Sequence, residues 1–236
     1  MPAAIADLAN APNDSSTTEL VAVTGVFELS QVKYTQFYCE ENIYCMIRDH
    51  VAPELWEDFY VVFISNIEKC VALSFQKVCT TPDTPVYWDY HVILLHHPRT
   101  TPHTITVYDL DTTLPFGLSH HSYLSHTFPT HPASPPAHFK LVPAKDYMRL
   151  FASTRAHMWR EIVNDEGDRG WRWVAEPPVW SCIVSEEEGE DTLERFLDFG
   201  HEGDRFGRVY GEGEFREVLE GMVGGGRVVE GVFSRV

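Results

Sequence analysis

The stretch Phe37-Tyr38-Cys39-Glu40-Glu41-Asn42-Ile43, at residues 37–43, is where extended chain is predicted to give way to a helix. Apolar residues recur at helical spacing through residues 39–50, and Glu40 and Glu41 occupy the first turn, where the helix dipole favours carboxylates. Pro53 ends the segment, because proline lacks the N–H that a continuing helix needs. Cys39 therefore lies at a helix N-terminus, an environment that stabilises a thiolate and makes a thiol nucleophilic.

Short segments rich in β-branched and aromatic residues follow this helix. Residues 59–65 and 71–76 are separated by a short polar link and are predicted to form a hairpin. Residues 86–96 and 104–110 are the next two predicted strands, and residues 144–159 have the apolar spacing of a helix. Because strands and helices do not alternate regularly, the pattern favours an α+β fold.

The composition restricts the classes of protein to which the chain can belong. With 236 residues, of which 44% are hydrophobic, the chain can form one substantial core. Its formal net charge of −17 disfavours binding to nucleic acid or to an anionic membrane surface. No segment reaches the roughly 20 apolar residues that span a bilayer, and the N-terminus lacks the basic flank of a signal peptide. The five cysteines lack the CxxC spacing of a zinc site and do not suggest a disulfide framework. We therefore expect a soluble, unexported protein with reduced thiols.

The predicted organisation is one domain with additions. Residues 1–30 lack sustained periodicity and are expected to be a largely mobile extension, followed by a single domain at residues 31–236. The segments near 117–138 and 184–205 are interpreted as inserted loops, the first rich in histidine and the second containing an acidic run. The histidine spacings put no fixed pair on a helix face and show no carboxylate partner. We therefore expect a solvated loop there and no metal site.

A thiol nucleophile needs a histidine and an acid, and two predicted strands can supply both. His91 lies in the middle of the apolar strand 86–96, with Asp89 on the same face by alternation. If the strand at 104–110 pairs antiparallel to it, Asp109 can lie beside His91 and accept its imidazole N–H. Cys39, His91 and Asp109 are then candidates for a catalytic triad. A core cysteine, a satisfied core histidine and a turn-forming aspartate remain as alternatives.

Several stretches of the sequence resemble the eukaryotic protein N-terminal glutamine amidohydrolases. They occur in the family's order from about residue 34 to residue 183 and, more loosely, over residues 209–215. The similar stretches are Tyr38 to Ile43, Val62 to Asn66, Trp88 to Val92, Tyr108 to Thr112, Leu114 to Phe116, Phe151 to Ser153 with Arg155 and His157-Met158, Glu176 to Pro178, and Cys182-Ile183.

The resemblance implies a monomeric enzyme that deamidates the N-terminal glutamine of proteins or peptides to glutamate through a thioester, without a cofactor. It implies an α/β sandwich with a mainly antiparallel sheet, similar to transglutaminases and papain-like thiol enzymes. The family's catalytic residues fall on Cys39, His91 and Asp109. The resemblance further implies a role in the N-degron pathway, in the cytoplasm and with the nucleus as a second location.

Recognition of a free N-terminus requires acceptors for three N–H donors. One carboxylate among Glu40, Glu41 and Asp89 is the expected acceptor, although the two glutamates could instead only favour the helix dipole. Negative charge beside Cys39 should also raise the pKa of its thiol. We therefore expect either a positive partner for these glutamates or an orientation away from the sulfur.

Trp88 and Phe63 are candidate walls for the aliphatic part of the glutamine side chain, with core packing as the alternative interpretation. Two other functions use the same residues. A thiol protease or transglutaminase would direct the triad at an internal amide, and an inactive module would bind N-terminal glutamine without turnover.

Overall fold

A computed structural model of the chain describes residues 26–79, 81, 84–128, 135–163, 167–200, 203–229 and 232–234. Most of the expected N-terminal extension, at residues 1–25, lies outside these ranges, as do residues 129–134 and 201–202 of the two expected loops. Among the helices that are described, none combines the length and the apolar character needed to cross a membrane.

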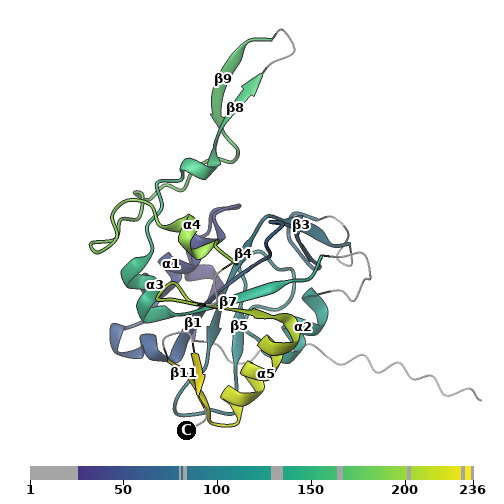
Figure 1. Ribbon diagram of the computed structural model, residues 1–236, viewed down its shortest axis with the longest axis vertical. Helices are drawn as coiled ribbons and strands as arrows, with labels where there is room; N and C mark the ends of the chain where they lie inside the picture. Colours follow the sequence, from purple (N-terminus) through teal and green to yellow (C-terminus); the bar gives the residue numbers. More distant parts are fainter. Residues whose placement is uncertain are drawn as a thin grey trace, which may run out of the picture.

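A six-stranded antiparallel sheet forms the centre of the molecule (Figure 1). The strand order is β10-β7-β1-β4-β5-β6, and every neighbouring pair is antiparallel. The strands are β1 (Phe59–Ser65), β4 (His91–His96), β5 (Thr106–Tyr108), β6 (Leu118–Ser119), β7 (His138–Pro143) and β10 (Arg208–Gly211). This sheet and the helices around it confirm the predicted α+β class.

Helices cover both faces of the sheet (Figure 1). One face packs against α1 (Cys39–His50), α3 (Ala144–Leu150) and α4 (Leu193–Phe196), and the other against α2 (His120–Thr127) and α5 (Glu212–Val223). Alternate residues of β1 enter the two cores, so the whole strand is buried. Each fully buried large apolar side chain contributes about 1.5–3 kcal/mol. The predicted helix at residues 39–50 is confirmed and lies directly against this sheet.

Smaller elements complete the fold. Three 3₁₀ turns are η1 (Leu29–Gln31), η2 (Pro53–Asp58) and η3 (Ala156–Met158). Three two-stranded pairs are β2 (Val71–Leu73) with β3 (Val86–Trp88), β8 (Trp159–Val163) with β9 (Arg169–Trp173), and β11 (Arg227–Val229) with β12 (Val232–Ser234). The β8–β9 hairpin projects from the body of the protein (Figure 1).

The predicted hairpin between residues 59–65 and 71–76 is wrong, although both segments contain strands. β1 pairs with β4 and β7, whereas β2 pairs with β3 outside the main sheet. Asn66 turns the chain away from the sheet, because its side-chain oxygen accepts from the backbone N–H groups of Glu68 and Cys70. Its amide also donates to the Pro136 carbonyl. These contacts direct the link out of the sheet.

The predicted strand at residues 86–96 is interrupted at Asp89 and Tyr90, so β3 and β4 belong to different sheets. The Asp89 side chain accepts from the Tyr90 backbone N–H at 2.9 Å, and Ser65 Oγ donates to the Asp89 carbonyl. The break cancels the predicted alternation across this segment. Trp88 consequently stacks on His91, with ring centroids 6.0 Å apart, rather than facing away from it.

The helix predicted for residues 144–159 ends at Leu150. The next residues extend, because the Ala152 backbone N–H donates to Thr192 Oγ1 at 2.8 Å and the Ser153 N–H donates to the Ile183 carbonyl at 2.9 Å. At Arg155 the backbone adopts a left-handed conformation with φ of 64°. The chain then enters β8 at Trp159.

The histidine-rich segment predicted as a solvated loop forms β6 and α2 over much of its length. Ser119 caps α2 by accepting from the Ser122 backbone N–H. Tyr123 and Leu124 of α2 are buried in the core shared with α5. The segment is therefore part of the layer that covers one face of the sheet.

Candidate active site

The Cys39 thiol lies at the start of α1 and is only 8% exposed. It donates to Glu40 Oε2, with the sulfur and oxygen 3.6 Å apart. Burial, followed by the Glu40 and Asp111 carboxyls, raises the pKa of the thiol well above its ordinary value, and the Val92 backbone N–H only partly offsets them. The protonated thiol is therefore the resting form at neutral pH. Desolvation and the two carboxyls thus act against the thiolate that a helix N-terminus favours.

Alkylation of Cys39 is expected to depend on pH in the direction that this raised pKa sets. Only the thiolate reacts with iodoacetamide, so the rate should be low at pH 7 and continue to rise beyond the range in which an ordinary thiol has ionised. Mass spectrometry of the Cys39 peptide after timed alkylation measures the rate. A rate that is already constant from pH 6 upward would show a stabilised thiolate instead.

His91 and Asp109 form a buried pair, and His91 lines the same cavity as this thiol. His91 is the first residue of β4, and its Nε2 lies 2.9 Å from Asp109 Oδ1, just beyond the end of β5. β4 and β5 are antiparallel, as the pairing argument required. Burial lowers the pKa of His91, but the neighbouring carboxyls, with Asp109 foremost, more than compensate and raise it overall. With Nε2 engaged by Asp109, Nδ1 is the ring nitrogen left for proton transfer.

Three donors hold the Asp109 carboxylate. His91, the Tyr123 hydroxyl at 2.8 Å and the Asp111 backbone N–H at 2.8 Å all contact its two oxygens. Burial raises the pKa of Asp109, but His91 and these hydrogen bonds outweigh it and lower the pKa overall. Asp109 is therefore ionised and fixed in position, as an orienting acid must be.

Asp111 is a second buried carboxyl at this site. Tyr34 Oη donates to Asp111 Oδ1 at 2.6 Å, and Asp111 contributes to the raised pKa of Cys39. Burial raises the pKa of Asp111, while His91 acts in the opposite direction. Among the described residues, His91, Asp109 and Asp111 also form one of two groups with metal-ligand atoms close together. The His91 nitrogen in contact with Asp109 is occupied by that hydrogen bond.

Glu40 does not carry a full charge beside the resting thiol. Burial raises the pKa of Glu40 to about 8, although its own backbone N–H and the Tyr90 hydroxyl act against this. Its Oε1 has no hydrogen-bond partner among the described residues, and His157 Nε2 is 3.8 Å away. Glu40 is therefore largely protonated at neutral pH. It ionises only in the alkaline range, where it then opposes ionisation of Cys39.

Glu41 has the positive partner that the sequence argument required. Arg155 Nε donates to Glu41 Oε1 at 2.9 Å and Arg155 Nη2 to Oε2 at 2.8 Å, a bidentate pair that is almost fully buried. Trp180 Nε1 donates to Glu41 Oε2 at 2.7 Å. The same guanidinium donates to the Pro178 and Trp180 carbonyls. Arg155 thus ties the first turn of α1 to the loop at residues 175–182.

A cavity of about 320 Å³ brings the candidate groups together. It is lined by four residues that the sequence analysis predicted for the active site: Cys39, Trp88, Asp89 and His91. The other lining residues are Phe37, Ser65, Lys69, Tyr90, Asp111, His157, Met158, Arg160, Val174, Glu194 and Leu197.

Three of the predicted substrate-binding residues, Phe63, Glu40 and Glu41, do not line this cavity. Phe63 is fully buried and stacks on Phe196 with ring centroids 5.2 Å apart, so its role is core packing. Glu41 is fully buried in the pair with Arg155. Of the three carboxylates proposed for ammonium recognition, Asp89 is the exposed one in the cavity.

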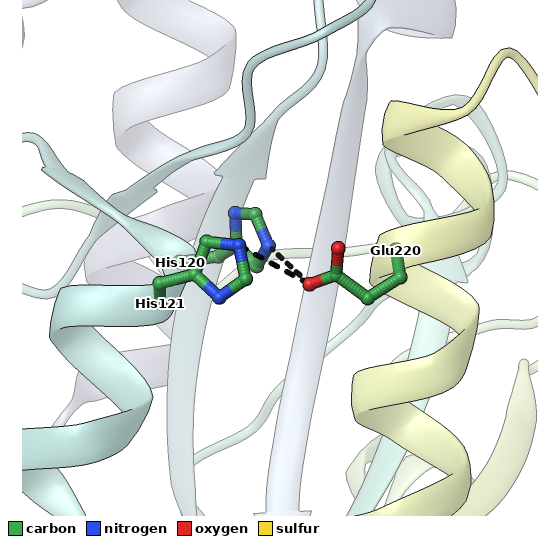
Figure 2. Close-up of side chains that lie close together, drawn as sticks. All are labelled: His120, His121 and Glu220. Carbon is green, nitrogen blue, oxygen red and sulfur yellow. Dashed lines mark hydrogen bonds and ion pairs between the residues drawn. The ribbon is translucent and has the colours of Figure 1, made fainter.

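A second cluster of ligand-type side chains joins α2 to α5 (Figure 2). None of its residues lines the cavity. His120 Nε2 and His121 Nε2 lie 3.3 and 3.2 Å from Glu220 Oε1. This corrects the expectation that the histidines have no helical pair and no carboxylate partner. Zinc accepts such a donor set, but the side chains of His121 and Glu220 are 67% and 54% exposed and have no other polar partner among the described residues. We therefore assign to the cluster the linking of two helices.

Several residues of the site were not predicted from the sequence. Tyr123, Asp111 and Tyr34 hold the acid end of the site, and Arg155 neutralises Glu41. Arg155 and Glu41 are 114 positions apart. A buried Glu41 in need of a partner was the available signal, but nothing in the spacing selects which arginine supplies it.

The amino-acid sequence is similar to those of known proteins. A family model described as N-terminal glutamine amidase matches residues 34–219, which include every cavity residue named above. Proteins named protein N-terminal glutamine amidohydrolase from Drosophila mojavensis and Drosophila melanogaster are each 37% identical to this chain over 163 residues. Each alignment covers 67% of this chain and 75% of the relative.

Proposed function

This chain belongs to the N-terminal glutamine amidase family, and we propose that it hydrolyses the side-chain amide of an N-terminal glutamine to glutamate with release of ammonia. One observation supports a reaction rather than binding alone. His91 lines the same cavity as Cys39, and the ionised Asp109 orients its ring. We propose Cys39 as the nucleophile, His91 as acid and base, and Asp109 as the orienting group.

The first half of the reaction forms a thioester. His91 takes the thiol proton of Cys39, and the resulting sulfur anion attacks the carboxamide carbon of the substrate. The backbone N–H of Cys39 is in the first turn of α1, where amides have no acceptor within the helix, and it stabilises the oxyanion. Protonated His91 then gives its proton to the departing nitrogen, and ammonia leaves a γ-glutamyl thioester on Cys39.

The second half restores the enzyme. His91 removes a proton from a water molecule, and the oxygen attacks the thioester carbon. The carbon–sulfur bond breaks, Cys39 recovers its proton from His91, and a carboxyl group remains where the carboxamide was. One water is consumed and one ammonia released, so the reaction balances without a redox partner.

We propose that Asp89 binds the α-ammonium of the substrate and so selects a terminal residue. It lines the cavity, is exposed, and is fixed at the break between β3 and β4 by its contact with the Tyr90 N–H. Glu40 is largely protonated and Glu41 is saturated by Arg155 and Trp180. Of the three carboxylates predicted for this role, Asp89 is therefore the available acceptor. Trp88, stacked on His91, serves as a wall for the methylene groups of the glutamine.

Asp89→Asn is expected to lower kcat/KM for a peptide with a free N-terminal glutamine by about 10- to 100-fold, the value of a charge-assisted hydrogen bond. Activity on the acetylated peptide, which has no ammonium, should be weak in both proteins and should not fall further in the variant. Asp146→Asn on the surface of α3 is the matched control. Equal activity of Asp89→Asn and Asp146→Asn on the free peptide would exclude ammonium binding by Asp89.

The test of the function is mass spectrometry of three short peptides incubated with the wild-type protein. One begins with glutamine, one begins with asparagine, and one has glutamine only at an internal position. A gain of about one mass unit on the first peptide alone is expected from amide hydrolysis. A change on internal glutamine would favour transglutaminase-type chemistry. No change on any peptide would favour a module that binds without turnover.

We further propose that the fold is of the transglutaminase and papain-like type and that the protein acts as a cytoplasmic and nuclear monomer. Its product, an N-terminal glutamate, would enter the N-degron pathway through arginylation. These proposals rest on the resemblance to the N-terminal glutamine amidohydrolases alone. Light scattering of the purified protein tests the monomeric state.

The role in the N-degron pathway is tested by the half-life of a glutamine-initiated reporter in cells with and without the protein. Equal half-lives would exclude this role.

A further inference from the structure

A hollow on the β8–β9 hairpin continues the active-site cavity outward. The cavity is lined at one side by Met158, Arg160 and Val174. The adjoining hollow is lined by Arg160, Ile162, Arg172, Trp173 and Val174. Because Arg160 and Val174 belong to both, a chain that leaves the cavity on this side meets the hairpin, which projects from the body (Figure 1).

The strand register puts most of these residues in one row. Arg160 lies directly opposite Arg172, Ile162 is opposite Gly170, and the Val174 N–H donates to the Met158 carbonyl at 2.8 Å. Residues that lie opposite one another, and residues two apart in a strand, share a face. Met158, Arg160 and Ile162 with Val174 and Arg172 therefore form one face, here called the hairpin row. It leads from the cavity toward the hairpin tip over about 17 Å, the length of a five-residue strand.

The hairpin row carries two arginines. Arg160 and Arg172 are exposed and directly opposed, a pairing that like charges make unfavourable. Neither guanidinium forms an ion pair with a carboxylate among the described residues, whereas Arg169 pairs with Glu161 at 3.3 Å on the other face. The chain as a whole has a formal net charge of −17. The pair is therefore a local positive site that attracts carboxylates on a protein of negative net charge.

The opposite face of the hairpin is occupied by its own side chains. Trp159 packs against Trp173 with ring centroids 4.8 Å apart and stacks on Trp171 at 6.5 Å. These cross-strand aromatic contacts stabilise the hairpin from this face. The hairpin row is consequently not needed for that packing and remains open to a ligand.

We propose that the hairpin row binds the polypeptide that follows the N-terminal glutamine, in extended conformation, and favours acidic side chains at about the third to fifth substrate positions. The proposal rests on the proposed function, since the first residue must be held in the cavity. Met158 and Val174 contact the chain as it leaves the cavity, and Arg160 and Arg172 bind carboxylates beyond it. The ligand is thus an acidic N-terminal segment of a protein rather than a free amino acid.

The experiment compares eight-residue peptides that begin with glutamine and carry Asp or Asn at positions three to five. The ratio of kcat/KM, Asp peptide to Asn peptide, is expected to be about 3 to 10 at low salt and to approach 1 at 0.5 M salt, as exposed ion pairs predict. Arg172→Gln should reduce the low-salt ratio to below about 2. Arg169→Gln is the matched control on the opposite face and should keep the wild-type ratio.

Binding of the same two peptides to Cys39→Ala, measured by titration calorimetry, separates this proposal from the proposed function. A preference for the Asp peptide that is lost in Cys39→Ala/Arg172→Gln supports the hairpin row even if no deamidation is found. Deamidation with equal kcat/KM for the two peptides, or equal binding of both, overturns the hairpin row and leaves the proposed function standing. A low-salt ratio in Arg172→Gln that equals the wild-type ratio also overturns it.

Discussion

Cys39→Ala is expected to lower deamidation of a glutamine-initiated peptide by about 10⁴- to 10⁶-fold, the usual consequence of removing a covalent nucleophile. No thioester can form without the sulfur, and the described part of the chain places no other cysteine in the cavity. The alanine removes one buried sulfur and leaves the His91–Asp109 pair in place. Ammonia release and peptide mass measure the loss, and circular dichroism should show an unchanged fold.

Cys182→Ala is the control for this result. Cys182 is exposed and outside the cavity, so its removal should leave the deamidation rate unchanged. During turnover of the wild-type protein, rapid acid quenching should trap the γ-glutamyl adduct on the peptide that contains Cys39. Wild-type rates in Cys39→Ala, or an adduct on another residue, would remove Cys39 from the mechanism.

The positions of strands and helices could be predicted from the sequence more reliably than the pairing of the strands. Hydrophobic periodicity located β1, but it carries no information about which strand lies next to which. β1 is buried on both faces and takes the place between β4 and β7, and the hydrogen bonds of Asn66 direct the following link elsewhere. The end of α3 escaped prediction for a similar reason. Thr192 and Ile183 accept hydrogen bonds from the backbone after Leu150, and both are distant in sequence.

The residues of the candidate site also differ in how far the sequence predicts them. Antiparallel pairing of two neighbouring strands was enough to bring His91 and Asp109 together, because these strands follow one another closely in the sequence. Side chains that shift the pKa values of this pair come from elements distant in sequence, such as Tyr123 on α2. The protonation of Cys39 and Glu40 follows from burial, which periodicity indicates for apolar positions only.

Arg155→Met is expected to destabilise the protein by about 3–5 kcal/mol, the cost of leaving one member of a buried ion pair without its partner. Methionine is apolar and flexible enough to fill much of the space, so the main loss is electrostatic. Glu41 would keep only the Trp180 N–H, while the Pro178 and Trp180 carbonyls would lose their donor. For a chain of this size the melting temperature should fall by roughly 6 to 20 °C.

Two further variants identify the cause of that loss. Arg149→Met removes an exposed arginine that pairs with Asp146 and Glu187, and it should cost less than about 1 kcal/mol. Glu41→Gln/Arg155→Met removes both charges and should recover part of the stability, because no buried carboxylate is then left unpaired. Glu41 is two residues from Cys39, so a disturbed first turn of α1 should also lower kcat in Arg155→Met at temperatures where it remains folded. If the double variant is no more stable than Arg155→Met, the loss comes from the loop at residues 175–182 and its carbonyls rather than from the charge of Glu41.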